Sequence, residues 1–208
     1  MNPSTPSRPS PHPGRVIILT GPPGAGKSTV ARLLADRLSP GVHLHGDDFW
    51  HFIKRGRIAP YLPGAHRQNE VVLGVLVSAA FGYAAGGYQV ICDGVVGPWF
   101  LDLFRAGARE RALPLSYVVL RPDRRTTLER ATGRGGDALT DPGPVRSLHD
   151  QFSDLGVHEA HVLDSGGLTA EETAGSVLRG IATGAYLLDP AAGGTGGGVA
   201  ANGPLRDS

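Results

Sequence analysis

A glycine-rich segment near the N-terminus constrains the fold of this chain more than any other feature. It reads Gly-Pro-Pro-Gly-Ala-Gly-Lys-Ser over residues 21–28, directly after the apolar run Val16–Thr20 and directly before a stretch with helical character. Glycines at this spacing let successive backbone N–H groups curl around a phosphate, while the lysine brings positive charge to the outer phosphates. The segment therefore predicts a phosphate-binding loop between a buried strand and a helix.

The loop residues divide into expected roles. Lys27 is expected to act in catalysis as well as in binding, and the Ser28 hydroxyl is a candidate ligand of Mg²⁺. ATP with Mg²⁺ is the expected cofactor pair. The residues predicted to cradle the triphosphate are Gly21, Pro22, Pro23, Gly24, Ala25, Gly26, Lys27, Ser28 and Thr29.

Length and charge narrow the class of partner. A chain of 208 residues can bury one sheet with helices on both faces, so a single domain is expected. Lysine and arginine total 20 against 19 acidic residues, which leaves no surplus of positive charge to attract long nucleic acid. The expected partner is a small molecule with a hydroxyl group, and nothing in the sequence indicates the oligomeric state.

The expected compartment follows from one cysteine and one apolar run. Cys92 has no second cysteine to pair with and lies in a strand-like run, which favours a reducing, cytoplasmic setting. The first 14 residues lack the apolar core of a signal peptide. The uncharged run from Val71 to Cys92 is interrupted by Gly86 and Gly87, so it predicts a buried helix, a tight turn and a buried strand without a membrane partner.

Short β-branched runs alternate with helical patterns, which predicts an α/β fold with a parallel sheet. The domain is expected over residues 15–187, between a disordered Pro/Ser-rich tail (1–14) and a disordered Gly-rich tail (188–208). The expected strands are 15–20, 42–45, 88–93, 115–120 and 161–163. The expected helices are 27–38, 65–85, 98–112, 124–131, 144–155 and 169–182.

Ligands bind at the carboxyl ends of the strands in such a sheet. Asp47 and Asp48 follow the second expected strand and are candidate general bases that accept the proton of an acceptor hydroxyl. Either could instead cap the following helix. An aromatic lining of an acceptor pocket is expected nearby, although each ring could equally belong to the core; the candidates are Phe49, Trp50, His51, Tyr61 and Trp99.

Two further segments complete the expected site. Asp93 ends the third expected strand and is a candidate ligand of Mg²⁺, directly or through water. The stretch around residues 130–143 combines arginines with glycines, which predicts a short mobile lid that closes over the nucleotide. Arg130 and Arg134, which flank the glycines, are the expected nucleotide contacts in this lid.

The segments GPPGAGKST, GDDF, ICDG and RATGRGG, in this order over about residues 15–182, together resemble the small phosphate-loop kinases. This group includes gluconate and shikimate kinases, chloramphenicol phosphotransferase and the kinase domain of polynucleotide kinases. The resemblance implies a three-layer P-loop NTPase fold. It also implies that Asp47 is the acceptor-activating carboxylate, or Asp48 if the chain is aligned to the chloramphenicol enzyme. By the same resemblance, Arg130 stacks on adenine and Arg134 contacts the transferred phosphate.

Three functions follow from these patterns. The first is transfer of the γ-phosphate of ATP to a hydroxyl of a small molecule, with an antibiotic as one instance. The second is a nucleoside, nucleotide or polynucleotide kinase, which requires a second phosphate-binding cluster; Trp50 and His51 stand where polynucleotide kinases carry a basic residue, and the nearby cations are Lys54, Arg55, Arg57 and Arg67. The third is an ATP-dependent switch or ATPase without a small-molecule acceptor.

Overall fold

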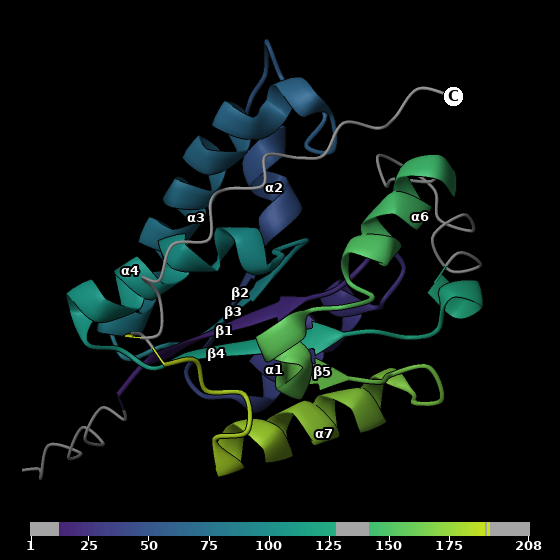
Figure 1. Ribbon diagram of the computed structural model, residues 1–208. Helices are drawn as coiled ribbons and strands as arrows, with labels where there is room; N and C mark the ends of the chain where they lie inside the picture. The colour runs from purple at the N-terminus through teal and green to yellow at the C-terminus, as the bar shows by residue number, and fades with distance from the viewer. Residues whose placement is uncertain (1–12, 128–141, 190, 192–208) are drawn as a thin grey trace, which may run out of the picture.

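The computed structural model of the chain describes residues 13–127, 142–189 and 191 (Figure 1). The two predicted terminal tails lie almost entirely outside these residues. Most of the predicted lid does so too, and with it Arg130 and Arg134.

Five parallel strands form one sheet at the centre of the molecule, in the order β2-β3-β1-β4-β5 (Figure 1). This confirms the predicted α/β fold with a parallel sheet. Because all the strands run the same way, their carboxyl ends meet at one edge of the sheet. The strands are β1 (Arg15–Thr20), β2 (Gly41–His45), β3 (Gln89–Asp93), β4 (Leu115–Leu120) and β5 (Val162–Leu163).

Helices cover both faces of the sheet and make three layers. On one face, α3 (His66–Ala85) and α4 (Leu101–Arg111) pack on Val16 and Ile18 of β1. On the other face, α1 (Lys27–Arg37) and α7 (Ala170–Thr183) pack on the alternate β1 side chains. Period-two alternation therefore sends the apolar side chains of β1 to both cores, as a strand buried on both faces requires.

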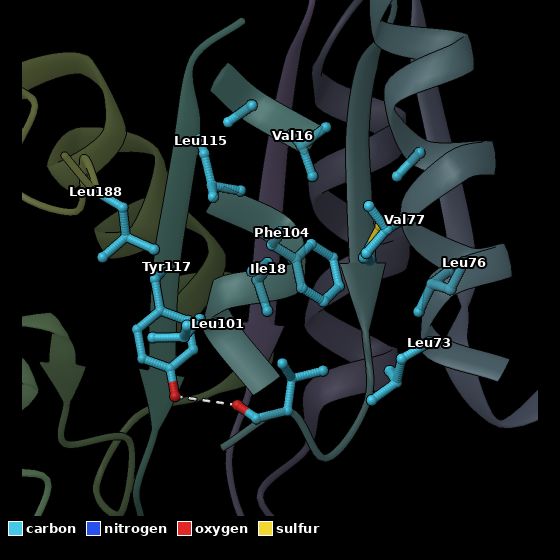
Figure 2. Close-up of a cluster of buried hydrophobic side chains, with 14 of the residues drawn as sticks. Val16, Ile18, Leu73, Leu76, Val77, Leu101, Phe104, Leu115, Tyr117 and Leu188 are labelled. Atoms are coloured by element: carbon cyan, nitrogen blue, oxygen red, sulfur yellow. Dashed lines mark hydrogen bonds between the residues drawn. The ribbon is translucent and has the colours of Figure 1, made fainter. Parts of the chain in front are cut away.

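The core under α3 and α4 is shown in Figure 2. Phe104 and Leu101 of α4 lie over the sheet, and Tyr117 of β4 points its hydroxyl toward the loop after β3. That hydroxyl donates a hydrogen bond of 3.0 Å to the carbonyl oxygen of Val96. Leu188 also packs into this core, although the sequence places it at the start of the C-terminal tail. The packed chain therefore extends at least to Leu188.

The long uncharged run forms the predicted helix, turn and strand, but only part of the helix surface is buried, since Val71, Val75 and Tyr83 are exposed. It forms most of α3, then a turn in which Gly87 has a φ of 92°, and then the fully buried strand β3 with Cys92 inside. Among the described residues, no helix combines the length and the apolar character that crossing a membrane requires.

Several local elements differ from the sequence expectation. A short helix, α2 (Gly46–His51), follows β2 directly and was not predicted, because six residues are too few to show a helical period. The expected helix from residue 98 begins as a 3₁₀ turn over Pro98–Phe100 before α4 starts. Helix α6 (Pro142–Gln151) ends four residues before the expected Leu155. Of the expected helix at 124–131, only residues 124–127 are described, and they are helical.

Candidate active site

The glycine-rich loop joins β1 to α1, and its backbone explains its glycines. Gly21 has a φ of 140°, and a Cβ there would lie 2.1 Å from the carbonyl oxygen of Leu120 on the neighbouring strand. Gly24 and Gly26 have φ values of 89° and 85°, in the left-handed region that disfavours side chains. The turn therefore depends on glycine at these positions, and it brings the start of α1 to the sheet edge.

Lys27 and Ser28, the first residues of α1, point in different directions. The Lys27 side chain is buried, and its Nζ donates hydrogen bonds of 3.0 Å to the carbonyl oxygens of Gly21 and Pro22. The ammonium group thus lies within the loop itself. The Ser28 hydroxyl donates to Oδ2 of Asp93 at 2.5 Å. This bond joins the loop to the end of β3.

Asp93 is only 2% exposed, and both of its carboxylate oxygens have donors. Oδ2 accepts from Ser28, and Oδ1 lies 2.8 Å from Nε2 of His43. Burial disfavours the charged form, but the hydrogen bonds from His43 and Ser28 and the nearby imidazole of His45 hold the pKa of Asp93 below its usual value. The carboxylate is therefore ionised at neutral pH, at the place where a cation would meet the phosphates.

His43 and His45 are two residues apart in β2, so their rings lie on the same side of the strand. Their ring centroids are 6.2 Å apart. His45 is the register partner of Asp93. Nδ1 of His45 lies 3.1 Å from Oδ1 of Asp48, and its Nε2 lies 4.0 Å from Oδ2 of Asp93. Burial lowers the pKa of His45, but the hydrogen bond to Asp48 and the charges of Asp93 and Asp47 raise it overall.

Sequence reasoning missed both histidines. The available signal was their spacing of two within a strand that ends beside an acidic pair, because this spacing places both rings on one face of the strand. A histidine within an apolar strand gives no sign of function until the neighbouring strand is known. Here the neighbour is β3, and the partner is the carboxylate that ends it.

Asp47 and Asp48 occupy the first turn of α2, and both are exposed. His45 is the N-cap residue of this helix and makes no side-chain cap, so neither aspartate serves as the N-cap. The start of α2 can approach β3 closely because residue 46 is glycine. A Cβ at this position would lie 2.6 Å from the carbonyl oxygen of Asp93. The acidic pair therefore sits beside the Ser28–Asp93 contact.

The predicted aromatic lining separates into buried and exposed residues. Trp50 is 9% exposed and packs in the core, where its Nε1 donates a 2.9 Å hydrogen bond to Oδ1 of Asn69. It therefore fills the core between α2 and α3, not an open pocket. Phe49 and His51 are partly buried, whereas Tyr61 and Trp99 are exposed by 43% and 46%. The side chain of Trp99 folds back over Gly97.

The oxygen atoms at this edge fit the needs of Mg²⁺ only in part. The hydroxyl of Ser28 and the carboxylate of Asp93 are adjacent, and oxygen ligands suit this cation. Within residues 13–127, 142–189 and 191, no cluster of three or more His, Cys, Asp or Glu side chains is arranged to hold a metal ion. A Mg²⁺ ion held here would need phosphate oxygens and water as its other ligands, as is usual where this cation binds together with a nucleotide.

A strand, a glycine-rich loop ending in Lys-Ser and a helix, at the carboxyl edge of a parallel sheet, define a P-loop NTPase fold. The chain belongs to the AAA domain family, whose model matches residues 16–152. No curated protein matches the chain.

Solved structures share the fold. A sugar kinase from Janibacter sp. has a TM-score of 0.63 at 20% identity, over 82% of this chain and 95% of that one. A gluconokinase from Sinorhizobium meliloti has a TM-score of 0.61 at 18% identity, over 83% and 94%. The tunicamycin resistance protein of Deinococcus radiodurans has a TM-score of 0.60 at 18% identity, over 85% and 99%. These likenesses establish the fold and confirm the resemblance to small P-loop kinases.

Proposed function

We propose that the chain is a kinase that transfers the γ-phosphate of ATP to a hydroxyl group of a small molecule. The observation that carries this proposal is the continuous contact from the phosphate loop to the acidic pair. Ser28 bonds Asp93, Asp93 approaches His45, and His45 bonds Asp48 at the start of α2. In this proposal the acidic pair supplies the carboxylate that accepts the proton, beside the loop that holds the triphosphate.

Each group has a role in this reaction. The backbone N–H groups of the loop and the Lys27 ammonium hold the phosphates and offset their charge. Ser28 and Asp93 would hold Mg²⁺, which supplies positive charge to the β- and γ-phosphate oxygens when bound. The acceptor oxygen attacks the γ-phosphorus while its proton passes to the aspartate. A new O–P bond forms, the bond from the γ-phosphorus to the bridging oxygen breaks, and ADP leaves.

Asp47 is the better candidate for the base. Oδ1 of Asp48 already contacts Nδ1 of His45 at 3.1 Å, so this carboxylate is engaged with the imidazole. Asp47 is exposed on the same helical turn, and it raises the pKa of His45 by its charge without a hydrogen bond to it. The acceptor hydroxyl would therefore meet Asp47, with Asp48 and His45 beside it.

The fold allows more than one acceptor. Relatives in structure include a sugar kinase and a tunicamycin resistance protein, so a sugar-like metabolite and an antibiotic are both instances of the proposed reaction. The expected contacts of Arg130 and Arg134 with the nucleotide belong to this proposal as well, and they lie outside the described residues.

Product detection tests the proposal. The purified protein is incubated with Mg²⁺ and ATP and a panel of hydroxylated compounds, and phosphorus NMR follows the appearance of ADP and of a phosphate ester. A new ester signal that requires both the acceptor and Lys27 supports the kinase. If ATP yields only ADP and free phosphate across the panel, the protein is an ATPase or a switch and the proposal fails.

A further inference from the structure

The segment Phe52–Gln68, which runs from the end of α2 into the first turn of α3, carries an unbalanced charge. It contains four lysine and arginine residues and no acidic residue, whereas the rest of the chain has 16 basic and 19 acidic residues. All four side chains are exposed, and none forms an ion pair within the described part of the chain. The four residues are Lys54, Arg55, Arg57 and Arg67.

A hydrogen-bonded clamp joins the parts of the segment that carry two of these cations. The side chain of Gln68 accepts a hydrogen bond from the backbone N–H of Ile58 at 2.9 Å and donates one to its carbonyl oxygen at 2.7 Å. Arg57 and Arg67 each adjoin one partner in this clamp. The chain segments that carry these two arginines, ten residues apart in the sequence, are therefore joined at the start of α3.

The segment is fixed to α3 at a second point. Nδ2 of Asn69 donates to the carbonyl oxygen of Pro60 at 2.8 Å, while Oδ1 of Asn69 accepts from Nε1 of Trp50 in α2. One buried amide thus ties the segment to both helices. The backbone is held in place, and the cationic side chains point outward from a fixed support.

The same segment exposes large apolar side chains. Phe52 is 67% exposed, and it follows directly on α2, the helix that carries Asp47 and Asp48. Exposed apolar groups next to uncompensated cations suit a ligand that has both an apolar part and a negative charge. The other exposed apolar residues in the segment are Ile58, Tyr61 and Leu62.

We propose that the phosphate acceptor is an alcohol that also carries an anionic group, a carboxylate or a phosphate ester, bound by Arg57 and Arg67. The inference rests on the proposed kinase function. Grouped like charges repel one another, and an anion relieves that repulsion. The planar guanidinium fork matches the oxygens of carboxylate and phosphate. A neutral antibiotic would leave these arginines without a partner.

Anion binding is measured first, without turnover. The protein is saturated with Mg²⁺ and AMPPNP so that the phosphate loop is filled, and sulfate serves as the probe. The midpoint of thermal unfolding is followed against sulfate concentration, with chloride at equal ionic strength as the reference. We expect the half-saturating sulfate concentration to rise at least about tenfold in the double variant Arg57→Gln/Arg67→Gln.

A matched variant controls for the loss of charge. Arg32→Gln/Arg111→Gln removes two positive charges from exposed sites on α1 and α4, and its sulfate curve should follow that of the unchanged protein. Equal curves for all three proteins would overturn the anion site. Far-UV circular dichroism of each variant confirms that the fold is kept.

Turnover then separates the acceptor assignment from the kinase function. Matched acceptors that differ in one group, gluconate against glucitol and glycerol 3-phosphate against glycerol, are compared by kcat/KM. The anionic member should be favoured at least about tenfold, and Arg57→Gln/Arg67→Gln should remove the preference mainly through KM. Transfer that favours the neutral members would overturn the assignment and leave the kinase standing. Transfer to a 5′-hydroxyl oligonucleotide that improves with its length would also overturn it.

A different outcome is sulfate binding that depends on the two arginines, without phosphate transfer to any alcohol. In that case the anion site stands and the proposed kinase function fails, and the acceptor assignment falls with it.

Discussion

The phosphate loop with the end of β3 and the segment Phe52–Gln68 are built in opposite ways. In the first region, Lys27 and Asp93 are buried, and each polar contact is made to a fixed backbone or side chain. In the second, the backbone is fixed by Gln68 and Asn69 while the charged and apolar side chains are exposed. Buried, fully bonded groups serve a step common to many acceptors, whereas exposed groups on a fixed support can change with the acceptor.

Lys27→Ala is expected to have the largest effect on function. The Lys27 ammonium lies within the loop, so its removal takes away the positive charge closest to the phosphates. Turnover of ATP should fall below detection in a coupled ADP assay. Thermal unfolding should stay cooperative, because the backbone turn depends on Gly21, Gly24 and Gly26. Turnover that persists would show that the loop does not hold the transferred phosphate.

Asp47→Asn is expected to rank second. Loss of the proposed general base should lower kcat by about a hundredfold or more, while the affinity for ATP, measured by calorimetry, stays nearly unchanged. Asp48→Asn is the matched variant on the same helical turn, and it should cost less because Asp48 is paired with His45. A larger loss of kcat in Asp48→Asn than in Asp47→Asn would assign the base to Asp48, the residue that contacts His45 of β2.

His43→Ala tests whether the buried region depends on an orienting residue. His43 contacts Oδ1 of Asp93, the proposed Mg²⁺ ligand, and losing such a partner of a metal-binding carboxylate typically costs about tenfold or more in metal affinity. The Mg²⁺ concentration that gives half-maximal ATP turnover should rise by this factor. His43→Gln, which can still donate a hydrogen bond, should recover part of the loss. If both variants behave alike, His43 has no orienting role.

Trp50→Phe tests the border between the two regions. The substitution leaves Oδ1 of Asn69 without its donor and should lower the free energy of unfolding by about 2 kcal/mol. KM for the acceptor should be unchanged, because Trp50 is buried in the core. Trp99→Phe, at an exposed position, should show little change in stability. An increase in KM without loss of stability in Trp50→Phe would return Trp50 to the acceptor pocket.

The same division explains what the sequence could predict. The strands, the phosphate loop and Asp93 follow from local patterns, because apolar runs and glycine spacing determine them directly. The five-stranded parallel sheet was predicted for this reason and is confirmed. The pairing of β2 with β3 brings His43 to Asp93, and no local pattern contains that information. The hydrogen bond that holds Trp50 in the core is made to Asn69, nineteen residues away, so no local pattern separates Trp50 from the other four pocket candidates.

The smallest expected effect concerns the pH dependence of stability at His45. The raised pKa of His45 means that its protonated form is stabilised in the folded state, by Asp48 above all other partners. Its contribution to stability is fully present below the unfolded pKa, about 6.5, and is lost as the pH rises through the folded pKa. Both side chains are partly exposed, so the contribution is expected to stay below about 1 kcal/mol. Denaturant unfolding of the unchanged protein and of His45→Gln between about pH 5.5 and 8.5 measures it. The difference between the two should shrink as the pH rises, and a constant difference would show that the His45–Asp48 contact does not depend on the charge of the imidazole.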